Sequence, residues 1–475
     1  MTTSRVAIAA VLMSLCITPL SRAKVYVHWT QRAIPAVKTL GADDLVLDWN
    51  DDAKTIVEAA TKRGYHVYFE TTLEQAVSTL DSAARVAAVG IIVKAETSKA
   101  AEAEAVVQKL KVAHPELKIL VLNSGGRQPD MRGWLVFNKN GILQVSSPTS
   151  QPWLDSNFAL VHYEQAIQKT QPPLYTFAWD LSDPLVKEQG PHPEDYALAI
   201  AEAGAFHADL VLEIYGKQQK GLAEGDKNVL ADWELVKRTL AFYQRNDTTG
   251  EPTARVAVLT GDYDSSYETL NLMARHNIPY RVLHSSEVTA QDLAAFDVVI
   301  AFAELSKELS EGLSPFVNSG GVAVLVNLKG PYPWESSADV KTSGPSVTYT
   351  IGKGRIIALA EPVADPETFV QDVRRLMVKD RIPVSLWNSL TTLVVAYPQK
   401  QSGDVIVELV NYAQESLQVQ VQVKGKFTSV KYDTPERTNW EMVKPSFVDG
   451  FTEFVVSGVV IGGRVHLAAA ETSAR

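Results

Sequence analysis

Two carboxylates, Asp180 and Glu213, are the side chains in this sequence best placed for acid–base chemistry. Each lies at or near the end of a short apolar run, residues 174–180 and 208–216, and the segment 194–206 between them carries apolar residues at helical spacing. Apolar runs rich in aromatic and β-branched residues predict buried strands. A strand, a helix and a second strand place two parallel strands side by side, with both carboxylates at the C-terminal edge where α/β proteins build their sites. Two facing carboxyl groups can exchange protons with a bound molecule.

Other polar and aromatic residues at predicted strand ends are candidates for contacting a substrate. They are Asp48, Trp49, Glu70, Glu96, Asn123, Trp179 and Tyr215. Apolar neighbours raise the pKa of a carboxyl group and suit it to proton donation. The alternative for every acid is a structural role, in which it caps a helix or pairs with a cation such as Lys94 or Arg127. His28, at the end of the first run, is either a substrate contact or a structural histidine.

Alternating strand and helix patterns in residues 24–250 predict a barrel. The strand-like runs are residues 25–29, 45–49, 66–70, 87–93, 118–122, 174–180 and 208–216, and helical patterns separate most of them. Repeated β-α units indicate a parallel sheet, and about eight units in about 225 residues favour a small (β/α)8 TIM-like barrel over an open sheet. The sixth strand is either residues 143–146, or a hairpin turning at Asn140-Gly141 is inserted there.

Two more domains are expected after a polar, turn-rich linker at residues 247–252. Residues 251–375 carry a second β-α series, which predicts a flavodoxin-like α/β domain with a hairpin around Gly352-Lys353-Gly354. In residues 376–475 the apolar period changes to two, which predicts a small antiparallel β-sandwich.

Local sequences in the last two domains carry a family resemblance. They are Gly320-Gly321-Val322-Ala323-Val324, Ile351-Gly352-Lys353-Gly354-Arg355-Ile356-Ile357 and Val407-Glu408-Leu409-Val410-Asn411-Tyr412. Together with the domain order, they make the chain resemble glycoside hydrolase family 42, the β-galactosidases with a trimerisation domain. The resemblance implies a barrel glycosidase and a middle domain that serves structure or assembly into a homo-oligomer.

Glycosidases need two carboxyl groups that face one glycosidic bond. The resemblance therefore implies that Asp180 and Glu213 cleave a poly- or oligosaccharide, with Trp179 and Tyr215 beside the sugar. The fourth run ends Val93-Lys94-Ala95-Glu96 and lacks the Asn-Glu pair that carries the acid/base in family 42. A non-catalytic carbohydrate-binding or scaffold protein on a degenerate barrel is thus the alternative function.

Composition and motifs argue against several other functions. The net charge is −10, and no block of Lys and Arg interleaves with aromatic residues, which argues against nucleic acid or an anionic membrane surface as a partner. Residues 24–475 contain no cysteine, so the amidotransferase chemistry of related middle domains is excluded. The nine histidines form no HxH or HExxH pair. We therefore expect no metal and no cofactor.

The N-terminus resembles a secretory signal peptide that occupies residues 1–23. Arg5 precedes an apolar stretch at residues 6–20, and Ser21-Arg22-Ala23 offers small residues at the positions that a signal peptidase reads. Cleavage would leave Lys24 as the first residue of a secreted or periplasmic protein. The alternatives are a membrane anchor, for which the stretch is short, and lipidation at Cys16, which the bulky Leu15 disfavours.

Overall fold

The computed structural model describes most of the chain. The described residues are 23–49, 53–86, 88–94, 100–122, 137–139, 142–144, 156–167, 171–177, 191–245, 248, 250–286, 288–336, 338–413, 415–437 and 439–469. No helix among them is both long enough and apolar enough to span a bilayer.

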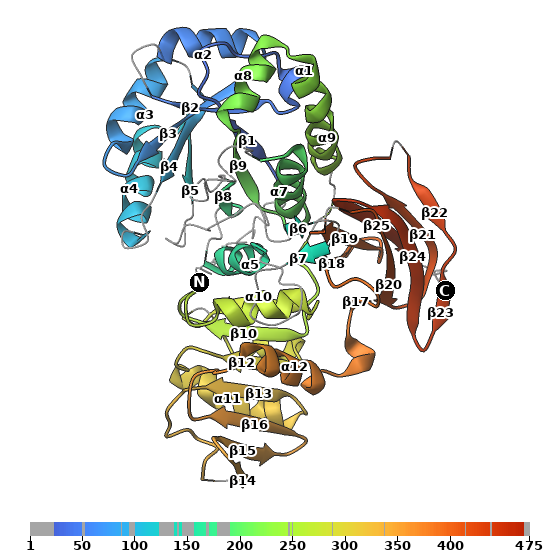
Figure 1. The fold of residues 1–475 in the computed structure, drawn as a ribbon. Coiled ribbons are helices and arrows are strands. Elements are labelled where there is room, and N and C mark those ends of the chain that lie inside the picture. The colour runs from blue at the N-terminus through green and yellow to red at the C-terminus, as the bar shows by residue number, and fades with distance from the viewer. Residues whose placement is uncertain are drawn as a thin grey trace, which may run out of the picture.

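A parallel sheet of seven strands forms a nearly closed barrel (Figure 1). In sheet order the strands are β5 (Lys118–Leu122), β4 (Gly90–Lys94), β3 (His66–Thr72), β2 (Asp44–Asp48), β1 (Val25–His28), β9 (Asp209–Glu213) and β8 (Leu174–Phe177). The two edge strands approach one another, and Gln171 Nε2 donates to the Val121 carbonyl over 3.1 Å. The predicted parallel sheet is therefore confirmed in its nearly closed form.

Helices surround this sheet and cover its outer face (Figure 1). They are α1 (Val37–Leu40), α2 (Ala53–Lys62), α3 (Ala76–Arg85), α4 (Ala100–Ala113), α5 (Phe158–Ile167), α7 (Pro193–Ala205), α8 (Gly216–Glu224) and α9 (Lys227–Gln244). Helix α9 begins at Lys227, where the Asp226 side chain caps it by accepting from the backbone N–H groups of Asn228 and Val229.

Residues 143–146, the candidate for a sixth barrel strand, do not join the parallel sheet in their described part, residues 143 and 144. Strands β6 (Phe137–Lys139) and β7 (Ile142–Gln144) instead pair antiparallel in a separate two-stranded sheet. The sequence between them is Asn140-Gly141, and this dipeptide favours a tight hairpin over a continuing parallel strand. Among the described residues the barrel has seven parallel strands, and the inserted hairpin is the correct alternative.

Side chains alternate between the two faces of each barrel strand, as strand geometry requires. One face packs outward against the helices, and the other lines the barrel interior. The interior contains a separate apolar cluster of buried side chains: Tyr26, Val46, Tyr68, Ile92, Leu122, Leu174 and Val211. At Gly90 a Cβ atom would lie 1.9 Å from the Lys118 carbonyl oxygen, so only glycine allows β4 and β5 to approach this closely.

A second mixed sheet follows the barrel. Its order is β11 (Tyr280–His284), β10 (Val256–Thr260), β12 (Val298–Ala301), β13 (Val322–Val326), β16 (Gly354–Leu359), β15 (Ser346–Ile351) and β14 (Asp339–Ser343). The first five strands are parallel, and the last two form an antiparallel edge. Its helical segments are α10 (Tyr267–Arg275), η2 (Asp292–Ala295), α11 (Lys307–Asn318), α12 (Pro366–Leu376) and η3 (Lys379–Arg381).

Two antiparallel sheets form the C-terminal part. One has the order β17 (Val384–Leu386), β20 (Leu417–Lys424), β24 (Phe451–Val459), β23 (Ser446–Val448). The other has the order β18 (Thr392–Pro398), β19 (Val405–Asn411), β25 (Gly462–Ala469), β21 (Phe427–Asp433), β22 (Glu441–Val443). A single apolar cluster contains side chains of both sheets, including Val421 and Phe454 of the first and Leu409 and Val465 of the second. The two sheets therefore pack face to face.

Helix α5 lies between the barrel and the second sheet (Figure 1). Its Phe158 ring packs edge-on against Tyr280 of β11, with centroids 5.6 Å apart. Tyr163 similarly meets Tyr263, with centroids 5.4 Å apart. Helix α5 thus connects the barrel to the second sheet, which follows the barrel in the sequence.

Helix α7 connects the barrel to the C-terminal sheets through Glu202, whose side chain is buried. Glu202 accepts from the backbone N–H and the Nδ2 of Asn157 (3.0 and 2.7 Å), from the Tyr175 hydroxyl (3.4 Å) and from the Tyr412 hydroxyl. Burial raises the pKa of Glu202, while these hydrogen bonds lower it. One buried carboxyl group thus links α5, β8, α7 and the turn after β19.

Candidate functional site

Five polar side chains gather at the C-terminal end of the barrel strands. They are His28 of β1, Asp48 of β2, Glu70 of β3, Lys94 of β4 and Glu213 of β9, here called the rim cluster. Each stands two residues after a member of the apolar cluster inside the barrel, so each side chain is on the interior side of its strand. The sheet order makes the five strands consecutive neighbours. The cluster therefore forms one continuous arc at the mouth of the barrel.

One hydrogen bond and one ion pair organise the rim cluster. His28 Nε2 lies 3.2 Å from Asp48 Oδ1, and Lys94 Nζ lies 2.5 Å from Glu70 Oε1. The carboxylates of Asp48 and Glu70 stand opposite each other in the register of β2 and β3. One ligand atom from each of His28, Asp48 and Glu70 lies within 4.8 Å of the other two. The arc thus contains three carboxyl groups, one ammonium group and one imidazole.

The pKa of the Glu213 carboxyl group is raised by its surroundings. Burial raises the pKa of Glu213, and the negative charges of Glu70 and Asp48 raise it further. His28 and Lys94 lower it but do not cancel the effect of burial. A carboxyl group that keeps its proton above its usual range can act as a general acid.

Gln219 of α8 holds the ends of β1 and β9 together. Its Nε2 donates to the Ile214 carbonyl (2.8 Å) and to the His28 carbonyl (3.3 Å), and its Oε1 accepts from the Thr30 backbone N–H (2.9 Å). His28 and Glu213 are direct neighbours in the register of these two strands. Gln219 is buried, and its hydrogen bonds hold the ends of β1 and β9 in place beside each other.

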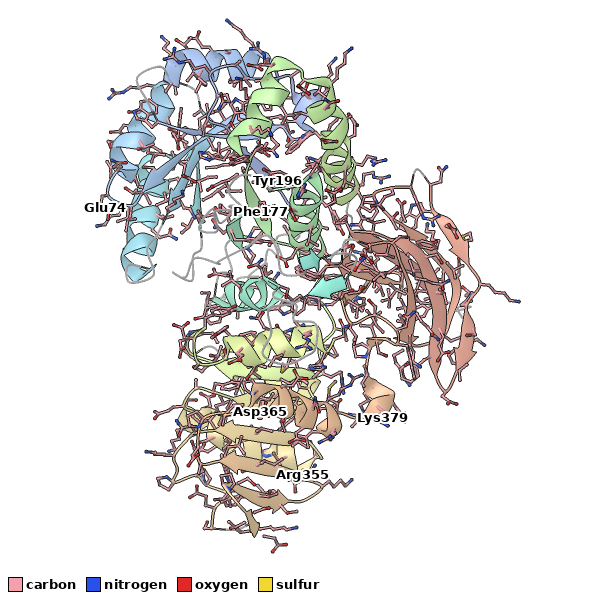
Figure 2. The ribbon with its side chains drawn as sticks, viewed as in Figure 1. Glu74, Phe177, Tyr196, Arg355, Asp365 and Lys379 are labelled. Carbon is pink, nitrogen blue, oxygen red and sulfur yellow. The ribbon has the colours of Figure 1, made fainter. Side chains whose placement is uncertain are left out.

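Helix α7 supports the same end of the barrel through Tyr196, which Figure 2 shows beside Phe177. The rings of Tyr196 and Phe177 meet edge-on with centroids 5.6 Å apart. The Tyr196 hydroxyl accepts from the Tyr215 backbone N–H over 2.9 Å. Tyr215, predicted as a substrate contact, is therefore anchored by its backbone directly after the strand that carries Glu213.

The structure brings together three of the carboxylates singled out from the sequence, Asp48, Glu70 and Glu213. Trp49 packs edge-on against Phe69 of the outward-facing layer, with centroids 4.9 Å apart, and is 40% exposed. Its ring therefore lies on the helix side of β3 and not inside the barrel. The predicted site residues Asp180, Trp179, Glu96 and Asn123 lie outside the described residues. The strand pairing predicted for the Asp180–Glu213 unit is present, because β8 and β9 are parallel neighbours.

The part that Lys94 plays was only weakly indicated by the sequence. The sequence indicated Lys94 only as a possible cation partner for an acid at a strand end. In the structure, Lys94 has this role and pairs with Glu70. The alternation of side chains along each strand could have identified the whole cluster. On each of the five strands, the polar residue comes two positions after an apolar residue that points into the barrel.

A second polar group occupies the opposite end of the barrel. Asp43, Asp44 and His66 have ligand atoms within 4.8 Å of one another, and the Lys24 backbone N–H donates to Asp209 Oδ1 over 2.8 Å. Burial raises the pKa of Asp209 to about 7. This end is where barrel proteins place residues that serve stability, so the C-terminal rim remains the better candidate site.

A pocket at the junction of the three parts is lined by residues that include Phe158, His162, Tyr280 and Val394. Burial lowers the pKa of His162 to about 3, which keeps the imidazole neutral. None of the lining residues is a carboxylate, so this pocket offers no acid–base pair.

No protein-family model matches the sequence, and no curated protein matches it either. Among solved structures, the chain is similar to alpha-L-fucosidase isoenzyme 2 from Paenibacillus thiaminolyticus, with a TM-score of 0.61 and 11% identity over 95% of this chain and 100% of that chain. A rhamnosidase from Novosphingobium sp. PP1Y is matched with a TM-score of 0.47 and 13% identity over 79% of this chain and 39% of that chain. The likeness to the fucosidase shows that the two chains share an overall fold.

Proposed function

We propose that this protein is a glycoside hydrolase that acts on a poly- or oligosaccharide at the C-terminal rim of its barrel. The observation that carries the proposal is the gathering of Asp48, Glu70 and Glu213 at the end where barrel enzymes build their sites. Glycoside cleavage needs two carboxyl groups near one bond, and neighbouring strand ends supply that spacing.

Glu213 is the proposed proton donor. It is partly buried and faces the other carboxylates of the rim cluster across the mouth of the barrel. The second catalytic carboxylate predicted from the sequence is Asp180, and this assignment stays a prediction. Among the described residues, Asp48 and Glu70 are the alternative candidates for this role. Trp179, Tyr215, Glu96 and Asn123 remain proposed sugar contacts, whereas Trp49 is no longer proposed as one because its ring packs on Phe69 at the helix side of β3.

The test is hydrolysis by the purified protein of a panel of aryl glycosides and polysaccharides. An aryl α-L-fucoside is the first substrate to try, because the similar structure is an α-L-fucosidase. The expected result is release of the aryl group from at least one glycoside, lost when Glu213 is replaced by glutamine. Binding of a glycan without release of product from any substrate would contradict the proposal.

A second function, carbohydrate binding without catalysis, is favoured by one observation. Glu70 is paired with Lys94 over 2.5 Å, which is the structural role expected of a strand-end acid in a non-catalytic barrel. Isothermal titration with oligosaccharides separates the two proposals, since a binding protein would take up a glycan that it leaves intact for days.

We also propose the finer architecture predicted from the sequence, with boundaries at residues 250/251 and 375/376. The five parallel strands of the second sheet follow the order 2-1-3-4-5, as in flavodoxin-like sheets, which supports that interpretation. The layout of barrel, α/β domain and antiparallel sheets supports the proposed likeness to family 42. Assembly through the middle domain is tested by light scattering, which should report an oligomer.

Export to the periplasm or the medium completes the proposal. It rests on the signal-like residues 1–23. N-terminal sequencing of exported protein should begin at Lys24, and a sequence beginning at Met1 would contradict cleavage.

A further inference from the structure

Three side chains of the rim cluster have the chemistry and spacing of metal ligands. His28, Asp48 and Glu70 each offer one ligand atom, and these atoms lie within 4.8 Å of one another. His28 Nε2 and Asp48 Oδ1 are 3.2 Å apart. Two atoms bound to one ion at about 2.1 Å are about 3.0–3.4 Å apart for angles between octahedral and tetrahedral. The separation of this pair therefore fits two ligands of one ion.

A separate observation concerns the unused oxygen of Glu70. The Glu70 side chain is 9% exposed, and its Oε1 receives Lys94. Its Oε2 is buried and has no hydrogen-bond partner among the described residues. A buried carboxylate oxygen without a partner costs free energy, which a bound cation would recover. This unpaired oxygen, Glu70 Oε2, belongs to one of the three residues that offer ligand atoms.

We propose that His28, Asp48 and Glu70 bind a divalent transition-metal ion, for which zinc is the probe. A mixed set of one imidazole and two carboxylates suits zinc better than magnesium or calcium, which prefer oxygen ligands alone. Three protein ligands leave coordination positions open toward the barrel mouth. The sequence lacks short histidine motifs because these ligands come from three different strands.

The opposite end of the barrel provides a matched comparison. Asp43, Asp44 and His66 also have ligand atoms within 4.8 Å of one another. Two of these three side chains, Asp43 and His66, are exposed, compared with one, Asp48, at the rim, and His66 Nδ1 lies 3.6 Å from Asp44 Oδ1. None of these three side chains has a buried polar atom without a partner in the described part of the chain. The rim is therefore the site that we assign.

The test is isothermal titration of the full chain with zinc after removal of metals by a chelator. We expect one site in the wild type, with affinity at least tenfold lower in His28→Ala and in Glu70→Gln. His66→Ala is the matched control and should bind as the wild type does. Glu70→Gln is nearly isosteric, and circular dichroism of each variant before titration identifies those that are folded.

The proposal is overturned if the wild type binds no zinc, or if the folded Glu70→Gln variant binds it with unchanged affinity. Loss of binding in His66→Ala alone would place the ion at the other end of the barrel and would also overturn it. The titration measures binding only, so its result does not depend on whether the protein hydrolyses a glycoside.

Discussion

Glu213 combines burial with a position among like charges, and both raise the pKa of its carboxyl group. If it donates a proton to a leaving group, Glu213→Gln should lower kcat by roughly 10²–10⁴-fold, which is the usual contribution of a positioned acid or base. KM should change less, because glutamine keeps the shape of the side chain. Steady-state kinetics on the substrate found in the panel measures both constants.

The control for this variant is Glu58→Gln, which alters an exposed glutamate of α2 that is not part of the rim cluster and should leave kcat unchanged. An unchanged kcat in Glu213→Gln would move the search to Asp180, Asp48 and Glu70. Loss of thermal stability without loss of specific activity would assign Glu213 a structural role.

Asp209, at the other end of the barrel, should make stability depend on pH. Burial raises its pKa from 3.8 to about 7 in the folded chain, so between these pH values the unfolded chain has released a proton that the folded chain retains. The free energy of unfolding therefore falls as pH rises from about 4 to 7, by at most about 4 kcal/mol. Above the folded pKa this contribution to stability is lost completely.

Asp209→Asn removes this titration while keeping an acceptor for the Lys24 N–H. In the chain that starts at Met1, the variant should match the wild type near pH 4 and exceed its thermal midpoint near pH 8. Asp43→Asn, at an exposed neighbouring position, serves as the control. Parallel midpoint curves for wild type and Asp209→Asn across this range would contradict the raised pKa.

Among the structural elements, α7 contributes most through one residue. Replacing Glu202 by alanine would remove the acceptor that the half-buried Asn157 and the buried hydroxyls of Tyr175 and Tyr412 share. We expect a loss of about 3–5 kcal/mol in the free energy of unfolding, since several unpaired groups and a cavity are created together. Urea denaturation followed by fluorescence measures this loss.

Glu224→Ala, on the exposed face of α8, is the comparison for the α7 variant and should change the free energy of unfolding by less than about 1 kcal/mol. A similarly small change in Glu202→Ala would show that the four hydrogen bonds to Glu202 do not hold the parts together.

Strands that are buried on both faces were predictable. Short, continuous apolar runs are typical of a parallel sheet covered on both sides, and β2, β4 and β13 show such runs. Elements without a strong pattern escaped prediction. Strand β14 is exposed at all five positions, and α1 is a single turn of four residues. Helix α3 begins at Ala76, a boundary that apolar spacing alone does not define.

The candidate site was only partly predictable for a physical reason. Each acid at a strand end could be located in the sequence, but its neighbours depend on sheet order and register. The pairing of Lys94 with Glu70 joins β4 to β3, and the contact of His28 with Asp48 joins β1 to β2. Such cross-strand contacts follow from the three-dimensional arrangement and leave no spacing pattern along the chain.

The whole molecule is held by one apolar cluster that includes side chains from all three parts, such as Phe158, Tyr280 and Tyr412. Deleting residues 251–375 would therefore expose the face of α5 that packs on Tyr280 and Tyr263. We expect the shortened protein to aggregate, because exposed apolar surface of this kind drives association. Size-exclusion chromatography of the purified variant detects this.

Deleting only the exposed edge strand β14 is the control and should leave a monodisperse protein. A monodisperse, fully active chain after removal of all of residues 251–375 would contradict the structural role of this part.

The bond between the Lys24 backbone N–H and Asp209 has a consequence for maturation. If a signal peptidase cuts after Ala23, this amide becomes the α-ammonium group of the new chain, and a positive charge replaces a neutral donor beside a buried acid. The charge would lower the pKa of Asp209 and remove much of its cost at neutral pH. A chain released from a fusion to begin at Lys24 should melt at a higher temperature at pH 7 than one beginning at Ala23, and equal midpoints would refute this. Processing would then do more than detach an export signal: the cut itself would complete the fold, and the uncut precursor would stay easier to unfold until it had crossed the membrane.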